Sequence, residues 1–83
     1  MTREHVDSVV IRSVGYDPTA SVLEVEFVDS GEVYEYFDVP YSVYLELMGE
    51  ESKGRYFNDF VKDLYASRRL GRRKGTEKKR DHP

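Results

Sequence analysis

Hydrophobic and polar residues alternate through the first half of the chain in the pattern typical of β-strands. In VLEVEFV (22–28) every second residue is apolar and the positions between carry Glu24 and Glu26, so one face is expected to be buried and the other solvated. SVVIRSVGYD (8–17) is rich in β-branched residues and ends at an Asp-Pro turn signal. EVYEYF (32–37) follows the turn residues DSG and predicts the return strand of a hairpin. Three antiparallel strands are therefore predicted.

The hairpin formed by the last two strands allows two registers. A two-residue turn pairs Phe27 with Tyr34 and puts Tyr34 and Tyr36 on the apolar face. A three-residue turn with a glycine bulge pairs Phe27 with Val33 and turns Glu35 toward that face. We favour the first register, because burying an unpaired carboxylate is costly.

Helical spacing replaces this alternation in the second half of the chain. Val39-Pro40 ends the sheet, and YSVYLELMG (41–49) predicts a short amphipathic helix. Ser52 is the expected N-cap of a second helix. The apolar face of that helix recurs at i, i+1, i+4, i+5, i+8 and i+9, and it consists of Tyr56, Phe57, Phe60, Val61, Leu64 and Tyr65. The expected fold is thus α+β, a three-stranded antiparallel β-sheet followed by two α-helices packed on one face (βββαα).

The length of 83 residues suffices for one small domain, and the absence of cysteine excludes disulfides and thiolate metal sites. We divide the chain into an N-terminal extension (1–7), an α+β domain (8–67) and a C-terminal tail (68–83). No apolar run reaches the ~20 residues of a membrane span, and the N-terminus lacks the apolar core of a signal peptide. A cytoplasmic protein without membrane association is therefore expected.

Charge divides the chain more sharply than its net −3 indicates. Residues 1–67 hold 14 Asp/Glu and 5 Lys/Arg, a net −9, whereas residues 68–83 hold 8 Lys/Arg and 2 Asp/Glu, a net +6. With Leu70 as its one large apolar residue, the tail is expected to be disordered. It could serve solubility, associate transiently with the acidic domain, or act as an electrostatic arm for nucleic acid. The arm residues considered for binding are Arg68, Arg69, Arg72, Arg73 and Lys74.

Catalytic chemistry is not expected of this chain. The two histidines, His5 and His82, lie near the termini, so no serine has a placed histidine to activate it, and there is no cysteine nucleophile. The strand carboxylates fall on the face expected to be solvated, and they are Glu24, Glu26, Glu32 and Glu35. The aspartates lack the spacing of a calcium loop. No enzyme activity, metal, cofactor or small-molecule substrate is therefore predicted.

The start of the second predicted helix is the first candidate binding site. Helix N-termini carry partial positive charge, so the cations Lys53 and Arg55 need a reason to be there. Gly54 inside a helix costs about 1 kcal/mol relative to alanine, so it is expected either to allow close packing or to open backbone N–H groups to an anion. The candidate anion or nucleic-acid site consists of Ser52, Lys53, Gly54, Arg55 and Asn58.

Tyr34 and Tyr36 form the second candidate site. Their rings could stack on nucleobases, where each stacked base is worth about 1–3 kcal/mol. Alternatively, both rings pack against the helices with their hydroxyls reaching the surface. The favoured hairpin register supports packing.

Six short motifs occur in a fixed order along the chain: VGYD (14–17), LEVEF (23–27), YEY (34–36), VP (39–40), VY (43–44) and SKGRYFN (52–58). This order resembles the KTSC domain family, which occurs at the C-terminus of some lysyl-tRNA synthetases and as free-standing small proteins. The resemblance runs from about Ser8 to Tyr65 and implies a short domain for which RNA binding has been proposed from its attachment to a tRNA-handling enzyme. The residues to which the family pattern points are Tyr34, Tyr36, Ser52, Lys53, Gly54, Arg55, Tyr56, Phe57 and Asn58.

We therefore expect a small non-enzymatic binding module, with RNA or an RNA-bound partner as its ligand. The helix start at 52–58 would supply an anion site and the basic tail would add non-specific affinity. The alternative is a protein–protein adaptor that uses the acidic sheet face or a helix surface. Carboxylates near the helix start shift weight toward the tail as the RNA contact, and they belong to Glu50, Glu51, Asp59 and Asp63.

Overall fold

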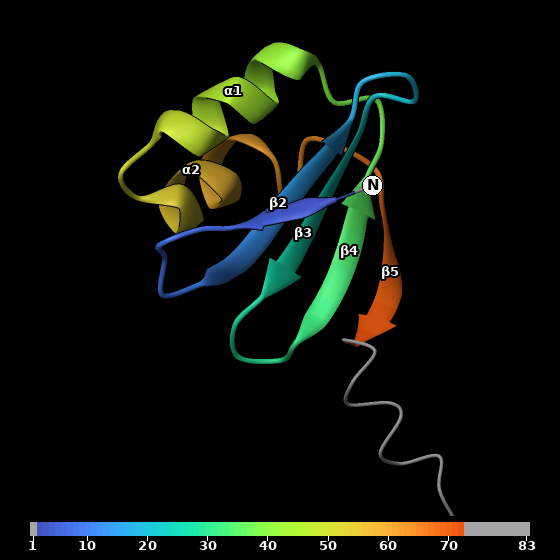
Figure 1. Cartoon of the computed structure of the whole chain (residues 1–83). Coiled ribbons are helices and arrows are strands. Elements are labelled where there is room, and N and C mark those ends of the chain that lie inside the picture. The colour runs from blue at the N-terminus through green and yellow to red at the C-terminus, as the bar shows by residue number, and fades with distance from the viewer. Residues whose placement is uncertain (1, 73–83) are drawn as a thin grey trace, which may run out of the picture.

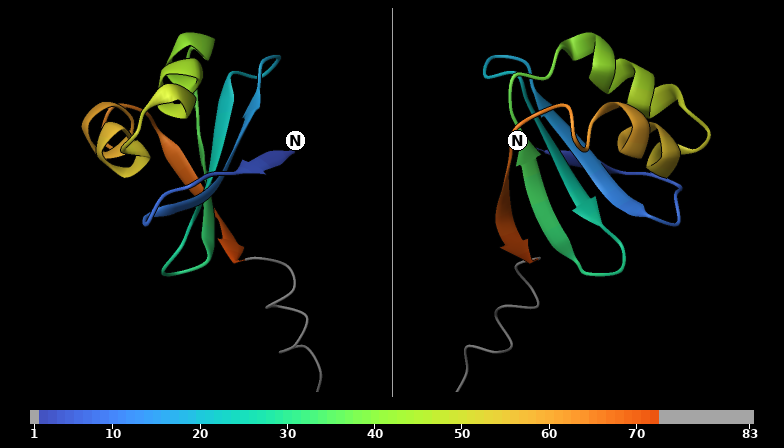
Figure 2. Two further views of the ribbon diagram at one scale, coloured as in Figure 1. Left: turned by 60° about the vertical axis from the view of Figure 1, so that its left-hand side comes forward. Right: turned by 180° about the vertical axis from the view of Figure 1, so that it is seen from behind.

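Five strands and two helices make up residues 2–72, the part of the chain that the computed structural model describes. In chain order they are β1 (Arg3–His5), β2 (Ile11–Asp17), β3 (Val22–Phe27), β4 (Glu32–Tyr36), α1 (Tyr41–Gly49), α2 (Lys53–Phe60) and β5 (Ser67–Arg72). The strands form one antiparallel sheet in the order β1-β2-β3-β4-β5. Both helices lie on one face of this sheet, and the β3–β4 turn and the end of β5 extend beyond them (Figures 1 and 2).

The α+β class and the two helices agree with the sequence prediction, but three strands is wrong. The first additional strand, β1, comes from the N-terminal extension, and β5 comes from the start of the tail that was expected to be disordered. Neither segment carries a run of alternating apolar residues, so hydrophobic periodicity could not reveal it. The chain from 73 to 83, which includes Arg73 and Lys74, lies outside the described residues.

A β-bulge changes which residues of β2 face the helices. The register of β2 against β3 shifts between Ile11 and Ser13. Because a bulge adds one residue to one strand, Ile11 and Val14 both point into the core, and both side chains are fully buried. Simple alternation would have placed these two residues on opposite faces of the strand.

The β3–β4 hairpin puts its tyrosines on the predicted face through a different register. Tyr34 pairs with Val25, two residues from its predicted partner Phe27. The connecting loop spans 28–31, and Gly31 adopts φ 72° there while its N–H donates to the Phe27 carbonyl at 3.0 Å. Since side chains alternate with a period of two, a shift of two residues leaves the face unchanged.

The core lies between the sheet and the two helices, and α2 contributes less to it than its periodicity predicts. Tyr56, Phe57 and Val61 are buried, but Phe60 is 52% and Leu64 is 65% exposed. The predicted core positions of the last two residues are therefore wrong. The helix ends at Phe60 because the backbone of Val61 leaves helical geometry at φ −124° and ψ −50°. Beyond that point the chain turns toward β5, so a 3.6-residue period no longer applies.

The outer face of the sheet, opposite the helices, contains an ion-pair network rather than solvated carboxylates. Glu24 and Glu26 are 8% and 2% exposed, which corrects the solvated position expected for them. Arg3 from β1 forms an ion pair and hydrogen bond with Glu24 and donates from Nε to the Ser13 hydroxyl at 2.9 Å. That hydroxyl donates in turn to Glu26 at 2.8 Å, and guanidinium nitrogens of Arg3 and Arg12 lie 3.9 and 3.8 Å from Glu26.

Two further ion pairs join β5, the edge strand on the other side of the sheet, to β4. Arg68 and Arg69 of β5 lie 3.1 Å from carboxylate oxygens of Glu35 and Glu32 on β4. Each added edge strand is therefore bound by backbone pairing and by arginines that meet acidic residues of an inner strand. The acidic positions of β3 and β4 thus have their counter-charges in segments that the sequence reading had left outside the domain.

Loss of the Arg3 guanidinium is expected to destabilise the fold. Arg3→Met keeps the aliphatic stem but removes the cation of Glu24 and leaves Glu26 with Arg12 as its cation, at a cost of about 1–3 kcal/mol in the free energy of unfolding. Urea denaturation measures this. Arg55→Met is the matched control, because the Arg55 side chain is 82% exposed and its pair with Asp59 spans 4.0 Å. Equal losses in the two variants would refute a structural role for Arg3.

The unequal burial of two aromatic residues on α2 gives a second stability test. Phe57→Ala removes a ring that is 5% exposed, and it is expected to cost about 3–5 kcal/mol. Phe60→Ala is expected to cost less than about 1 kcal/mol, since its ring is half exposed. Thermal or urea unfolding of both variants measures the difference. A Phe60 loss as large as the Phe57 loss would show that α2 continues its apolar stripe into the core.

Candidate functional site

The predicted helix-start residues occupy the first turn of α2. Ser52 takes the N-cap position, where its carbonyl accepts the Tyr56 N–H at 3.1 Å, although its side chain forms no cap hydrogen bond. The Lys53 ammonium donates to the backbone carbonyl of Glu50 at 2.7 Å. The ammonium thus binds the carbonyl of the C-cap residue of α1, which accounts for part of its presence there.

An acidic hollow of about 670 Å³ lies beside this helix start. It is lined by Glu46, Glu50, Glu51, Ser52, Arg55, Tyr56, Asp59 and Phe60. Carboxylates outnumber the guanidinium in this lining, and Arg55 pairs with Asp59 across one turn of α2. The anion site at Ser52, Lys53 and Arg55 remains a prediction, and these surroundings favour a cation over an anion.

Gly54 has a packing role. A Cβ atom at this position would lie 3.0 Å from both Cβ and Cγ2 of Val10, closer than carbon atoms normally approach. The missing side chain therefore lets α2 pack against the segment that leads into β2. Of the two reasons considered for this glycine, close packing is the one that the geometry supports.

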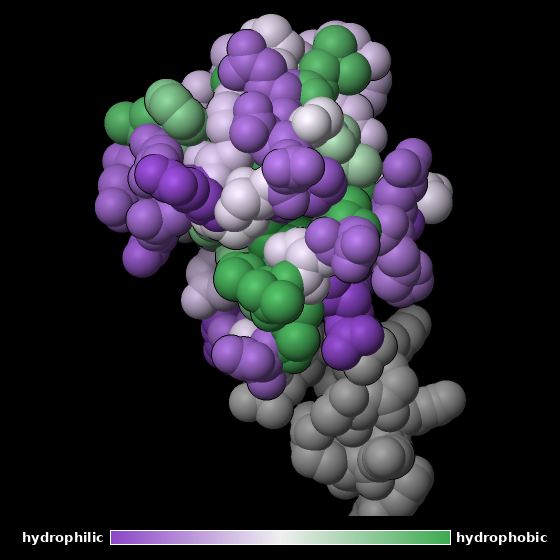
Figure 3. All heavy atoms as spheres, turned by 90° about the vertical axis from the view of Figure 1, so that its left-hand side faces the viewer, coloured by the Kyte–Doolittle hydropathy of each residue, from purple (hydrophilic) through white to green (hydrophobic). Residues whose placement is uncertain are grey.

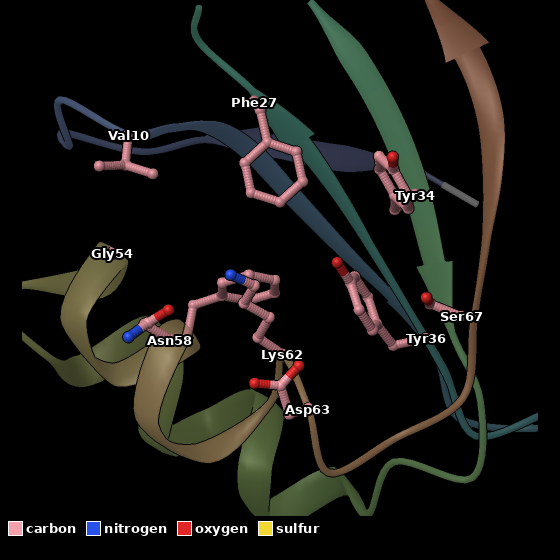
Figure 4. A pocket seen from close by; sticks show the side chains of 10 residues that line it. Val10, Phe27, Tyr34, Tyr36, Gly54, Asn58, Lys62, Asp63 and Ser67 are labelled. Carbon is pink, nitrogen blue, oxygen red and sulfur yellow. The ribbon is translucent and has the colours of Figure 1, made fainter. Parts of the chain in front are cut away.

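A second hollow, here called the aromatic groove, lies between α2 and the helix-facing side of the sheet (Figure 4). Its volume is about 590 Å³, within the range of ligand pockets. It is lined by Val10, Phe27, Tyr34, Tyr36, Gly54, Phe57, Asn58, Lys62, Asp63 and Ser67. Four predicted site residues meet here: Tyr34, Tyr36, Gly54 and Asn58. The fold separates them from Ser52 and Arg55, which line the acidic hollow.

Aromatic rings form the wall of this groove. Phe57 makes edge contacts with Phe27 and Tyr36 at centroid distances of 5.4 and 5.3 Å. Tyr34 stacks beside Tyr36 at 6.3 Å and meets Phe27 edge-on at 5.9 Å. Tyr36 is therefore a packed core ring with one side on the groove, whereas Tyr34 is only half buried and presents more of its surface.

The hydroxyl of Tyr36 differs from those of two other packed tyrosines. Tyr16 donates to the Val39 carbonyl at 2.5 Å, and Tyr56 donates to Glu46 at 2.6 Å. Tyr36 is 5% exposed, its hydroxyl points into the groove, and no residue within 2–72 accepts its proton (Figure 4). Burial, and secondly the neighbouring Tyr34, raises the pKa of Tyr36 to about 12. The group is therefore a neutral hydrogen-bond donor at physiological pH.

The polar rim of the groove includes three residues that the sequence analysis did not select. Lys62 and Asp63 follow the end of α2, and Ser67 begins β5. Figure 4 shows the Lys62 side chain reaching into the groove beside Asn58. A longer helix was expected at these positions, so their side chains could not be placed from periodicity. No local motif marks them.

The arm residues divide between strand β5 and the chain that follows it. Arg69 pairs with Tyr34 in the sheet register, so both side chains lie on the face that holds the groove, while Arg68 lies on the outer face with Glu35. The backbone of Arg72 pairs with Glu32 at the end of β5. Within the described residues no group of three His, Cys, Asp or Glu side chains is placed to hold a metal, and no helix could span a membrane.

These features define a small α+β module with an aromatic groove on the helix-facing side of its sheet. The KTSC domain family model matches residues 7–65, and the chain therefore belongs to the KTSC domain family.

Relatives of known sequence or structure include both free-standing proteins and larger enzymes. The chain is 45% identical over 60 residues to a lysine–tRNA ligase of Nostoc sp., covering 72% of this chain and 10% of that enzyme. It is 45% identical over 62 residues to an uncharacterised protein of Stutzerimonas stutzeri, covering 75% and 86% of the two chains. The crystal structure of a KTSC domain protein from Yersinia pestis is similar with a TM-score of 0.81 and 37% identity, covering 84% and 97% of the two chains. The chain thus spans about a tenth of the lysine–tRNA ligases it matches but most of the small proteins.

Proposed function

We propose that this protein is a non-enzymatic module that binds single-stranded RNA in the aromatic groove. The carrying observation is that the groove combines aromatic rings with a lysine and with the hydroxyl of Tyr36, which points into the groove and has no partner within the described residues. Unpaired bases stack on aromatic side chains, and their edges accept hydrogen bonds from groups placed beside the rings. Similarity to part of lysine–tRNA ligases supports RNA as the ligand class.

A basic group beside the rings would take a phosphate. Arg69 lies beside Tyr34 on β5 and is the candidate for this contact, whereas Lys62 reaches into the groove, where the base would lie. The ion pair of Arg69 with Glu32 is exposed, so it contributes about 0–1 kcal/mol and can be exchanged for a phosphate at little cost. Residues 73–83 hold 5 Lys/Arg and 2 Asp/Glu, and we propose that they add non-specific contacts.

Removal of the more exposed groove ring tests this proposal. Tyr34→Ala is expected to weaken binding of a short single-stranded RNA by about 1–3 kcal/mol, the value of one stacked base. Phe60→Ala is the matched control, because it removes a half-exposed ring outside the groove and should leave affinity unchanged. Fluorescence anisotropy measures both affinities, and thermal unfolding confirms that each variant is folded. Equal affinities for the two variants would count against the groove.

A protein-adaptor role is the second candidate function, and exposed apolar residues on the helix side favour it. Leu45, Phe60 and Leu64 are each at least half exposed, and Figure 3 shows hydrophobic patches within a mainly hydrophilic face. The acidic hollow borders Phe60, so the complementary partner would be a basic peptide with an apolar residue. The same two variants separate the candidates: such a peptide would lose affinity with Phe60→Ala and keep it with Tyr34→Ala.

A further inference from the structure

The aromatic groove contains both hydrogen-bond donors and hydrogen-bond acceptors. The Tyr36 residue is only 5% exposed, and its hydroxyl has no hydrogen-bond partner within residues 2–72. Its hydroxyl points toward the space between Phe27 and Lys62 (Figure 4). The geometry therefore leaves one donor position in the groove for a ligand acceptor.

The two charged residues of the rim add one donor and one acceptor of fixed type. The Lys62 ammonium can only donate hydrogen bonds, and the Asp63 carboxylate can only accept them. Asn58 can do both, so it does not discriminate between ligand edges. Burial raises the pKa of Tyr36 to about 12, so its hydroxyl keeps its proton at neutral pH and can donate to a ligand acceptor, while the fixed polarity of the site comes from Lys62 and Asp63.

The four bases differ in the order of hydrogen-bond donors and acceptors along the edge that they would present to these groove residues. Uracil and guanine carry a keto oxygen next to a ring N–H, which matches a donor beside an acceptor. Cytosine and adenine carry an amino group next to an unprotonated ring nitrogen, so the same positions have reversed polarity. A site with groups of fixed polarity disfavours the reversed pattern, because donors then face donors and the acceptor faces an acceptor.

Resting on the RNA-binding function proposed above, we propose that the aromatic groove selects keto bases. Tyr36 and Lys62 donate to the keto oxygen of uracil or guanine, and Asp63 accepts the adjacent ring N–H. Tyr34 and Phe57 supply the apolar surface on which the base rests.

The inference is tested with pairs of RNA homopolymers in which one member carries the keto pattern and the other carries the amino pattern. Affinities of wild-type protein are measured by fluorescence anisotropy for hexanucleotides of uridine against cytidine and of inosine against adenosine. We expect the keto member of each pair to bind about tenfold more tightly. Tyr36→Phe keeps the ring and removes a hydroxyl that has no partner within residues 2–72, so the fold should persist. It should lower affinity for the uridine and inosine hexamers severalfold, and by more than for the other two, whose amino groups can only donate to this hydroxyl.

Asp63→Asn is the second variant, since it changes only an exposed side chain at the rim. It should reduce the preference within both pairs without changing the thermal midpoint. If wild-type protein binds both members of each hexamer pair equally, and Tyr34→Ala still weakens RNA binding, base selection is overturned while the RNA-binding function stands. Absence of binding by every hexamer would overturn both. A Tyr36→Phe loss of equal size for all four hexamers would also contradict selection by the hydroxyl.

Discussion

The arrangement of this domain depends on the ion pairs that the Arg3 guanidinium forms with the two carboxylates of β3. Glu24 and Glu26 lie on the second of the inner strands with almost no exposure, and such carboxylates are costly to bury without a cation. Arg3 supplies the charge and, with it, the edge strand β1. Arg68 acts in the same way for Glu35 at the other edge. Charge pairing therefore closes the outer face of the sheet, and the aromatic residues remain for the opposite face.

On that opposite face, the groove lies beside a short helix, α2. Gly54 lets the helix approach Val10 closely, so α2 packs tightly at its start, and the helix then ends after Phe60. The sheet continues beyond it with Phe27 and Tyr34 only partly covered (Figures 1 and 4). The groove lies between α2 and these rings, and residues that follow the end of α2, Lys62 and Asp63, form part of its polar rim.

The hydrophobic pattern predicted those parts of the fold that are held by burial. The inner strands, helix α1 and the helix-facing position of Tyr34 all followed from apolar spacing, because each of these segments buries one face. The edge strands could not be predicted in this way, since backbone pairing and arginine ion pairs hold them and neither leaves an apolar period. The bulge in β2 and the end of α2 are tertiary effects on an otherwise regular pattern. For the site, the sequence pointed to Tyr34, Tyr36 and Asn58. The positions of Lys62 and Asp63 in the groove could not be predicted, because they depend on the path of the chain after the end of α2.

A residue-by-residue NMR titration with a short uridine-rich RNA tests the central claim, that the aromatic groove is the binding surface, most directly. Amide and side-chain shifts are predicted to cluster at the groove residues, which are Tyr34, Tyr36, Phe57, Asn58, Lys62 and Ser67. The acidic hollow beside Glu46 and Glu51 should show none, and it serves as the internal control. Shifts confined to residues 73–83, or to the acidic hollow, would contradict the account, as would a spectrum that does not change at all.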